Sequence, residues 1–186
     1  MFVQKVDDVR FHWQVDDRHA ALLRQSNLDE ISKSYCKTDK TEFEQQFWSA
    51  FFLYSNAGLT KRPQEKILYL LPALEGLLLR DGNEPIQKNL GERLAFIIGK
   101  TVEQRIEIVE TVTKFYAARS QFIHHGQEIK DLELFRKFMM IAWSLFFCLS
   151  LGARHFKTQK DFIDTLEMRK LSGVGLFQFS KAKESE

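Results

Sequence analysis

Apolar residues recur every three or four positions through most of this chain, a period that predicts amphipathic α-helices. The longest such pattern begins near Val102 and ends at Gly126, where a helix-ending glycine is expected. Its predicted inward stripe consists of Ile106, Val109, Val112, Phe115 or Tyr116, Phe122 and Ile123. Within that stripe, Arg119 takes a position where the period calls for a hydrocarbon. Because an unpaired guanidinium is costly in a dry interior, we expect Arg119 to meet a carboxylate, a phosphate or a cleft.

The same reading predicts five other helices, and each has a recognisable start or stop. Thr41 to Glu44 is a capping-box pattern, and Pro63 and Pro85 suit the first turn of a helix. The segment that begins near Lys130 becomes apolar on all sides after Phe138, as expected of a helix that neighbours cover throughout. The expected helices lie at about 41–55, 63–80, 85–98, 102–125, 130–152 and 157–170. About six helices with short loops predict an all-α helical bundle.

The two ends of the chain follow other patterns. Residues 9–15 alternate apolar and polar side chains, which predicts a half-buried strand. This strand would pair either with residues 174–180, in a small terminal β-ribbon, or with a second subunit. Residues 26–40 are polar and are predicted to be irregular. The expected organisation is an N-terminal extension at 1–40, a helical domain at 41–170 and a C-terminal tail at 171–186.

The net charge, the cysteines and the apolar runs of the chain limit the kinds of function that it can have. The chain has 186 residues and a formal net charge of only +2, so one ordinary domain is expected and wrapping of a long nucleic acid is not. Cys36 and Cys148 match no metal-ligand spacing, and buried, reduced thiols are the favoured interpretation over a disulfide or a nucleophile. No secretory signal opens the chain, and the apolar run 138–152 is shorter than a bilayer requires. We therefore expect a cytoplasmic protein without a membrane span.

Three charged residues lie on the apolar stripes of consecutive helices: Glu75, Arg93 and Arg119. They predict a polar network that is buried or lines a cleft; in a purely structural interpretation, they pair with one another and fix the helix register. His124 and His125 follow Arg119 and add groups that titrate near neutrality. The two histidines are adjacent and have no partner at zinc-ligand spacing, and no glycine-rich phosphate loop is present. No metal or cofactor is expected.

Three segments together resemble a known family. Residues 73–79 read ALEGLLL, residues 92–98 read ERLAFII and residues 116–126 read YAARSQFIHHG. In this order they resemble the Apea-like branch of the HEPN superfamily, over about residues 41–152. The resemblance implies an α-helical bundle that is often dimeric. It also implies the motif of many metal-independent endoribonucleases, an Arg and a His separated by four to six residues, which in this chain are Arg119 and His124. Many catalytic HEPN motifs place Asn, Asp or His after the Arg, whereas this chain has Ser120, as the Apea-like branch often does.

The resemblance implies cleavage of RNA through attack by the 2′-hydroxyl, with a 2′,3′-cyclic phosphate and a 5′-hydroxyl as products. His124 would act as base or acid and Arg119 would bind phosphate. The expected supporting residues are Tyr116, Ser120, His125, Glu75 and Arg93. RNA or a nucleotide is the expected ligand and a second copy the expected partner. The implied role is prokaryotic defence or toxin-like RNA restriction, with a larger defence assembly as a further option.

Two other interpretations stay open. In the first, the bundle is non-catalytic and Arg119 and the histidines hold a nucleotide or a partner protein. In the second, Arg119 forms an ion pair with Glu75 inside the bundle, and the chain is a dimerisation or sensor subunit. On a continuous helix, five residues turn through about 140°, so Arg119 and His124 of one chain do not share a face. They converge only if the helix frays at His124 or if a second subunit completes the site.

Overall fold

A computed structural model describes residues 28–80, 84–128 and 130–172 of the chain. Within these ranges it contains seven α-helices, one short 3-10 helix and no strand, so the predicted all-α class is confirmed. The chain divides into two compact units, residues 1–36 and 37–186. The strand expected at 9–15 and its expected partner at 174–180 lie outside the described residues.

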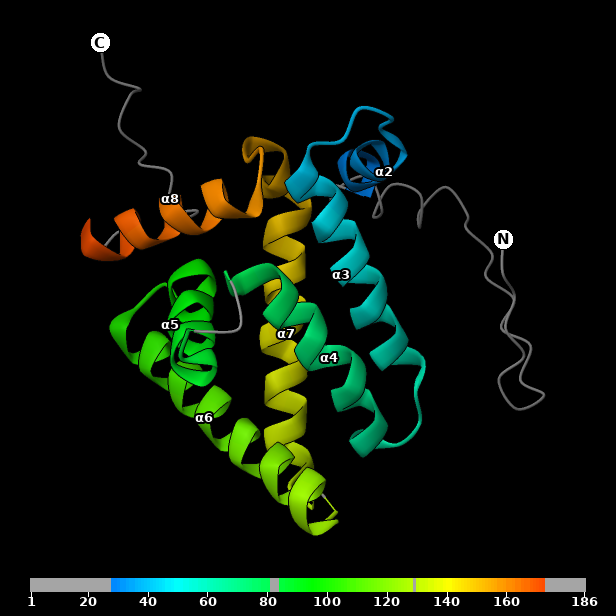
Figure 1. Ribbon diagram of the computed structural model, residues 1–186, viewed down its shortest axis with the longest axis vertical. Helices are drawn as coiled ribbons and strands as arrows, with labels where there is room; N and C mark the ends of the chain where they lie inside the picture. Colours follow the sequence, from blue (N-terminus) through cyan, green and yellow to red (C-terminus); the bar gives the residue numbers. More distant parts are fainter. Residues whose placement is uncertain (1–27, 81–83, 129, 173–186) are drawn as a thin grey trace, which may run out of the picture. The chain divides into compact units, whose positions relative to one another are not determined.

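The helices of the second unit follow the expected order, with ends that shift by a few residues (Figure 1). They are α3 (Glu42–Leu59), α4 (Pro63–Leu78), α5 (Ile86–Ile98), α6 (Val102–His125), α7 (Leu132–Gly152), the 3-10 helix η1 (Ala153–His155) and α8 (Gln159–Ser172). In the first unit, α2 (Leu28–Cys36) occupies a segment that was predicted to be irregular, and that prediction was wrong. Asp29 and Glu30 in its first turn and Lys33 in its last complement the helix dipole, which favours a helix in a polar sequence.

The start of α3 confirms the predicted capping box. The Thr41 hydroxyl accepts the Glu44 backbone N–H at 3.1 Å, and the Glu44 carboxylate accepts the Thr41 N–H at 2.8 Å. The same hydroxyl donates to the Phe156 carbonyl at 2.9 Å, which joins the start of α3 to the segment before α8. One short polar motif therefore satisfies free backbone N–H groups at the start of a helix and also connects two residues 115 positions apart in the sequence.

Contacts between aromatic rings join the helices of the second unit at several places. Phe43 of α3 stacks on Phe162 of α8 with ring centres 4.6 Å apart. Phe115 of α6 stacks on Phe138 of α7 at 3.8 Å. These four rings are among the largest fully buried side chains of the described residues. The stack of Phe115 on Phe138 fixes α6 against α7 and so helps to position the C-terminal half of α6, where the motif lies.

Helix α7 passes behind α4 in Figure 1 and contacts α3, α4, α5 and α6. It was expected to be covered on all sides, and this was wrong: Met140, Trp143 and Phe147 are 56%, 47% and 42% exposed. Their spacing places them on one uncovered face. Within the described residues, Leu132–His155 is the one helical stretch long and apolar enough to cross a membrane, and 39% of its apolar window is buried in the protein.

The two cysteines differ in their surroundings. Cys36 is exposed, contrary to expectation. Cys148 is partly buried, and burial raises the pKa of its thiol.

Candidate functional site

The C-terminal end of α6 forms as the sequence predicts. Gly126 adopts a left-handed conformation, with φ of 63°, and its N–H donates to the Phe122 carbonyl at 2.9 Å. A side chain is strained in this conformation, which explains a glycine at the helix end. His124 and His125 occupy the last turn and are exposed to solvent. A positive charge on either imidazole is favourable there because the carbonyl end of a helix carries partial negative charge.

The stripe that α6 buries differs from the predicted one. Ile108, Thr111, Val112 and Phe115 are its buried residues, whereas Ile106 and Ile123 are 54% and 45% exposed. Thr111 is tolerated in the core because its hydroxyl donates to the Glu107 carbonyl of the preceding turn at 2.7 Å. The buried face is therefore rotated from the one that apolar residues alone indicate. Ile123 is left on the surface one turn after Arg119.

Glu75 and Tyr116 form the centre of the candidate site. The Tyr116 hydroxyl of α6 donates to the Glu75 carboxylate of α4 at 2.6 Å. Glu75 was expected to need a partner among its leucine neighbours, and Tyr116 is that partner. Burial, together with this hydrogen bond and the charge of Glu75, raises the pKa of Tyr116 far above its usual value, while Arg119 acts in the opposite direction. Tyr116 therefore stays a hydrogen-bond donor at neutral pH and does not serve as a base.

Arg119 lies one turn beyond Tyr116 on α6 and is partly buried. Its charge acts to lower the pKa of the Tyr116 phenol, against the larger effects of burial and of Glu75. Among the residues that the structure describes, Arg119 has neither a hydrogen bond nor an ion pair. The ion pair between Arg119 and Glu75 that one interpretation required is not found. The guanidinium thus keeps its full set of donors for another acceptor.

Arg119 and His124 do not meet within one chain. Helix α6 is continuous from Val102 to His125, so it does not fray at His124. Five residues on such a helix turn the side-chain direction by about 140° and advance it by about 7.5 Å. Ser120 and His124 are both exposed, one turn apart, on a side of α6 turned away from Arg119. Fraying of the helix, the first of the two expected ways to bring the motif together, is therefore not observed, and completion by a second subunit stays a prediction.

Arg93 belongs to a different network. It is 3% exposed, and its guanidinium contacts both oxygens of Glu84 at 2.7 and 2.9 Å and Glu167 of α8 at 2.9 Å. It also donates to the Leu78 carbonyl at the end of α4. The opposing charges and hydrogen bonds outweigh burial, so the pKa values of both carboxyls are lowered. This network and the Glu75 and Tyr116 pair share no residue, so the structure places Arg93 outside the candidate site.

Sequence reasoning found Glu75, Tyr116 and Arg119 but missed Glu84 and Glu167. Glu84 precedes α5 in a loop and Glu167 lies on a helix 74 positions from Arg93, so no periodic pattern connects them.

In the part of the chain that the structure describes, no three His, Cys, Asp or Glu side chains lie together as metal ligands would. A scan against protein-family models and searches of curated proteins and of solved structures found no match for this chain.

Proposed function

We propose that this chain is a HEPN-type, metal-independent endoribonuclease that acts as a homodimer in the cytoplasm, in prokaryotic defence or a toxin-like role. The observation that carries the proposal is the partly buried Arg119, which has no hydrogen bond or ion pair among the described residues. A guanidinium left without a carboxylate beside a hydrogen-bonded Glu75 and Tyr116 pair is suited to an anion from outside the chain. A phosphate of RNA is such an anion.

The proposed reaction needs only groups that RNA and these side chains supply. A base takes the proton of the 2′-hydroxyl, whose oxygen attacks the adjacent phosphorus. The bond from phosphorus to the 5′-oxygen then breaks, and an acid protonates that oxygen. His124 of each motif acts as base or acid, and Arg119 stabilises the charge on the phosphorane. The products are a 2′,3′-cyclic phosphate and a 5′-hydroxyl. Ser120 would bind phosphate or orient the His124 imidazole, and His125 caps the helix end or assists.

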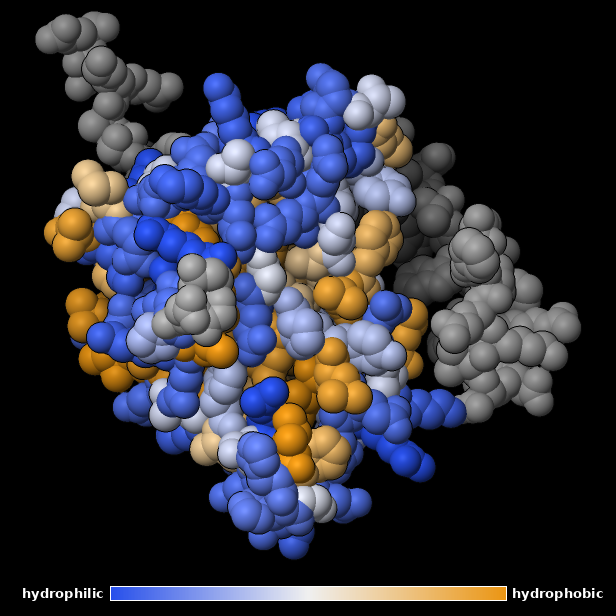
Figure 2. Space-filling model, viewed as in Figure 1, coloured by the Kyte–Doolittle hydropathy of each residue, from blue (hydrophilic) through white to orange (hydrophobic). Residues whose placement is uncertain are grey.

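The surface around Arg119 favours a second copy of the chain as the partner that completes the site. Ile123 follows Arg119 by one turn and is 45% exposed, and Leu68 lies two turns before Glu75 on α4 and is 60% exposed. Figure 2 shows apolar residues gathered over α4 and the C-terminal half of α6 among hydrophilic ones. A two-fold contact along this face would bury these side chains and bring two motifs together.

A non-catalytic module that binds a nucleotide is the second candidate. On the continuous helix α6, His124 points about 140° away from Arg119. A single chain therefore offers a cation without an adjacent base, which favours the non-catalytic module. Such a module would bind a nucleotide or a partner protein through Arg119 and would not cleave RNA. A larger defence assembly is compatible with either function.

The test is cleavage of single-stranded and structured RNA by the full chain, with and without chelator. We expect wild-type cleavage to persist with chelator and to leave cyclic phosphate ends, and Arg119→Ala and His124→Ala each to abolish it. Matched controls are Arg154→Ala and His155→Ala, which change exposed residues of η1 and should leave cleavage intact. Because Arg119 has no bonded partner among the described residues, its loss should change the unfolding temperature little. Nucleotide binding without any cleavage by the wild type would favour the non-catalytic module instead.

A further inference from the structure

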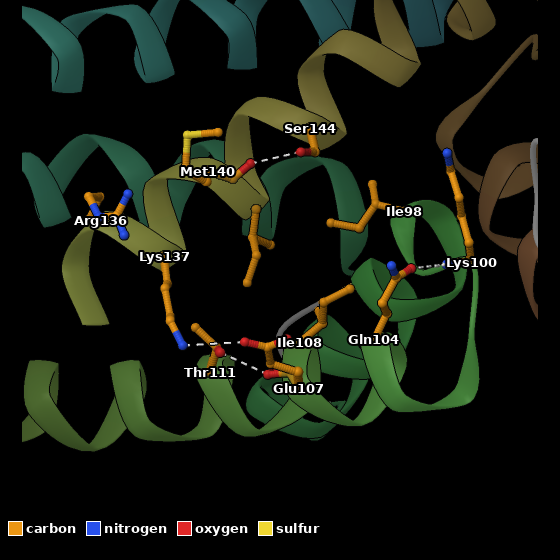
Figure 3. Close-up of a pocket in the computed structure, with 11 residues that line it drawn as sticks. Ile98, Lys100, Gln104, Glu107, Ile108, Thr111, Arg136, Lys137, Met140 and Ser144 are labelled. Atoms are coloured by element: carbon orange, nitrogen blue, oxygen red, sulfur yellow. Dashed lines mark hydrogen bonds and ion pairs between the residues drawn. The ribbon is translucent and has the colours of Figure 1, made fainter. Parts of the chain in front are cut away.

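A pocket of about 420 Å³ opens between the α5–α6 junction and α7, on the N-terminal half of α6 (Figure 3). Its α6 residues, Gln104 to Thr111, lie about 20 to 30 Å along the helix from His124, since the helix rises by about 1.5 Å per residue. None of its lining residues belongs to the candidate site around Arg119. The pocket therefore needs an explanation of its own.

The walls of this pocket are aliphatic. Ile98 of α5, Ile108 of α6 and Met140 and Ile141 of α7 supply its apolar surface. Its two hydroxyls offer little to a ligand, because Thr111 and Ser144 donate to carbonyls of their own helices at 2.7 and 2.9 Å. The side-chain oxygen of Gln104, the other uncharged polar residue of the lining, accepts the Lys100 backbone N–H at 2.9 Å. A sugar or polyol needs several convergent neutral polar groups, and most of those in this pocket are already bonded. The walls suit a saturated hydrocarbon chain.

The rim of the pocket is mainly cationic. Lys100, Arg136 and Lys137 line it together with one carboxylate, Glu107. Arg136 is already held by Glu133 of its own helix at 2.8 and 3.0 Å, which favours Lys137 as the cation that meets a ligand. Lys137 contacts Glu107 at 3.3 Å across the gap between α7 and α6, as Figure 3 shows. The Lys137 side chain is 49% exposed and the Glu107 side chain is 65% exposed. A pair this exposed contributes at most about 1 kcal/mol, so Lys137 can exchange Glu107 for a stronger anion at little cost.

We propose that this pocket binds a small anionic amphiphile, whose saturated chain lies on Ile98, Ile108 and Ile141 and whose carboxylate or phosphate head contacts Lys137. A water molecule takes up about 30 Å³ in the liquid, so the pocket volume equals that of roughly fourteen waters. This volume suits a hydrocarbon chain of medium length. A nucleotide fits less well because no aromatic side chain lines the pocket, and nucleobases bind by stacking. The uncovered apolar face at Trp143 and Phe147 continues beyond Met140 and would shield a longer chain.

The experiment is titration calorimetry on the full chain with decanoate and with decyl phosphate, both kept below their micelle concentrations. We expect at least one of them to bind and to raise the unfolding temperature, since a ligand of the native state stabilises it. Decanol and decyltrimethylammonium should bind about tenfold more weakly or not at all, because they lack the anion that Lys137 contacts. Comparison of the two anions identifies the head group, carboxylate or phosphate.

Variants of the pocket and of the surface outside it locate the binding. Ile141→Asp and Met140→Asp place a carboxylate among the aliphatic side chains and should abolish binding; Met140 is 56% exposed, so that variant should fold. Lys137→Gln should weaken binding about tenfold. Leu132→Asp and Lys114→Gln change exposed residues of α7 and α6 outside the pocket and should bind normally.

Three results would overturn the proposal. These are equal binding of the alcohol or the cation, unchanged binding in both aspartate variants, and binding only to vesicles of anionic phospholipid. RNA cleavage plays no part in these measurements, so the pocket and the proposed nuclease can fail separately.

Discussion

Arg93 keeps a charge inside the protein because several acceptors converge on its guanidinium. The position of this residue on an apolar stripe was visible in the sequence, and so was its need for a partner. Its partners were not, since Glu84 and Glu167 come from a loop and from a distant helix that only the folded chain brings together. The same limit applies to Glu75, whose partner Tyr116 is 41 positions away. Periodicity locates a buried charge but does not identify the group that compensates it.

Replacement of Arg93 should destabilise the chain far more than replacement of an exposed arginine. Arg93→Ala removes the guanidinium donors of two carboxylates and of the Leu78 carbonyl. Glu84 keeps the Arg80 N–H and the Asn89 side chain, and Glu167 keeps Lys170. Because the lost donors are charged and lie in the interior, we expect a loss of about 3 kcal/mol in the free energy of unfolding. Arg80→Ala is the matched control, because Arg80 and its partner Asp164 are 46% and 42% exposed and their pair should contribute less than about 1 kcal/mol. Urea unfolding measures both, and equal losses would contradict this account of the network.

Acid should weaken the same network. Burial acts to raise the pKa values of Glu84 and Glu167, but hydrogen bonds and charge outweigh it and lower both pKa values from 4.5. Arg93 contributes to both carboxyls, the Arg80 N–H and Asn89 contribute to Glu84, and Lys170 contributes to Glu167. Their contribution to stability is therefore complete above about pH 4.5 and is lost as the pH falls through the lower, folded-state pKa values. Urea unfolding at a series of pH values should show a steeper loss below pH 4.5 in the wild type than in Arg93→Met. Parallel curves would mean that Arg93 does not control these carboxyls.

At the scale of helices, starts and stops were predicted well and buried faces less well. Thr41, Pro63 and Gly126 mark ends that the structure has within a residue or so, because caps depend on local chemistry. The buried face of α6 depends instead on the packing of α5 and α7 against it, and a threonine whose hydroxyl is satisfied within the helix can replace an isoleucine there. The uncovered face of α7 has the same origin, since an apolar sequence does not supply a neighbour to cover it.

The left-handed cap of α6 gives a prediction at this scale. Gly126→Ala should lower the free energy of unfolding by about 1 kcal/mol, because a Cβ is strained at φ of 63° although nothing lies within 4 Å of it. Gly58→Ala is the control with the opposite sign, since Gly58 lies inside α3 with the same open surroundings and should gain up to about 1 kcal/mol. Thermal and urea unfolding test both. Stabilisation by Gly126→Ala would show that α6 does not end in this conformation in solution.

For the whole molecule, the sequence indicated the all-α class and the order of the helices from residue 41 onward. Both follow from the spacing of apolar residues within each segment. It also placed Tyr116 and Arg119 on one side of α6 and His124 on another. What periodicity does not give is how two copies associate, since that depends on surfaces that only the folded chain assembles. The exposed Leu68 and Ile123 near the candidate site are such surfaces.

If Arg119 of one chain works with His124 of its partner, paired variants should complement each other. A heterodimer of Arg119→Ala with His124→Ala, purified through two different tags, keeps one complete site of two and should cleave RNA at about half the wild-type rate. A heterodimer of the wild type with the double variant has no complete site and should be inactive. Motifs that act within their own chains reverse both results: the first heterodimer is then inactive and the second keeps one site. Because both heterodimers contain the same two substitutions, differences in stability do not explain opposite activities, and the rates decide where the site is assembled.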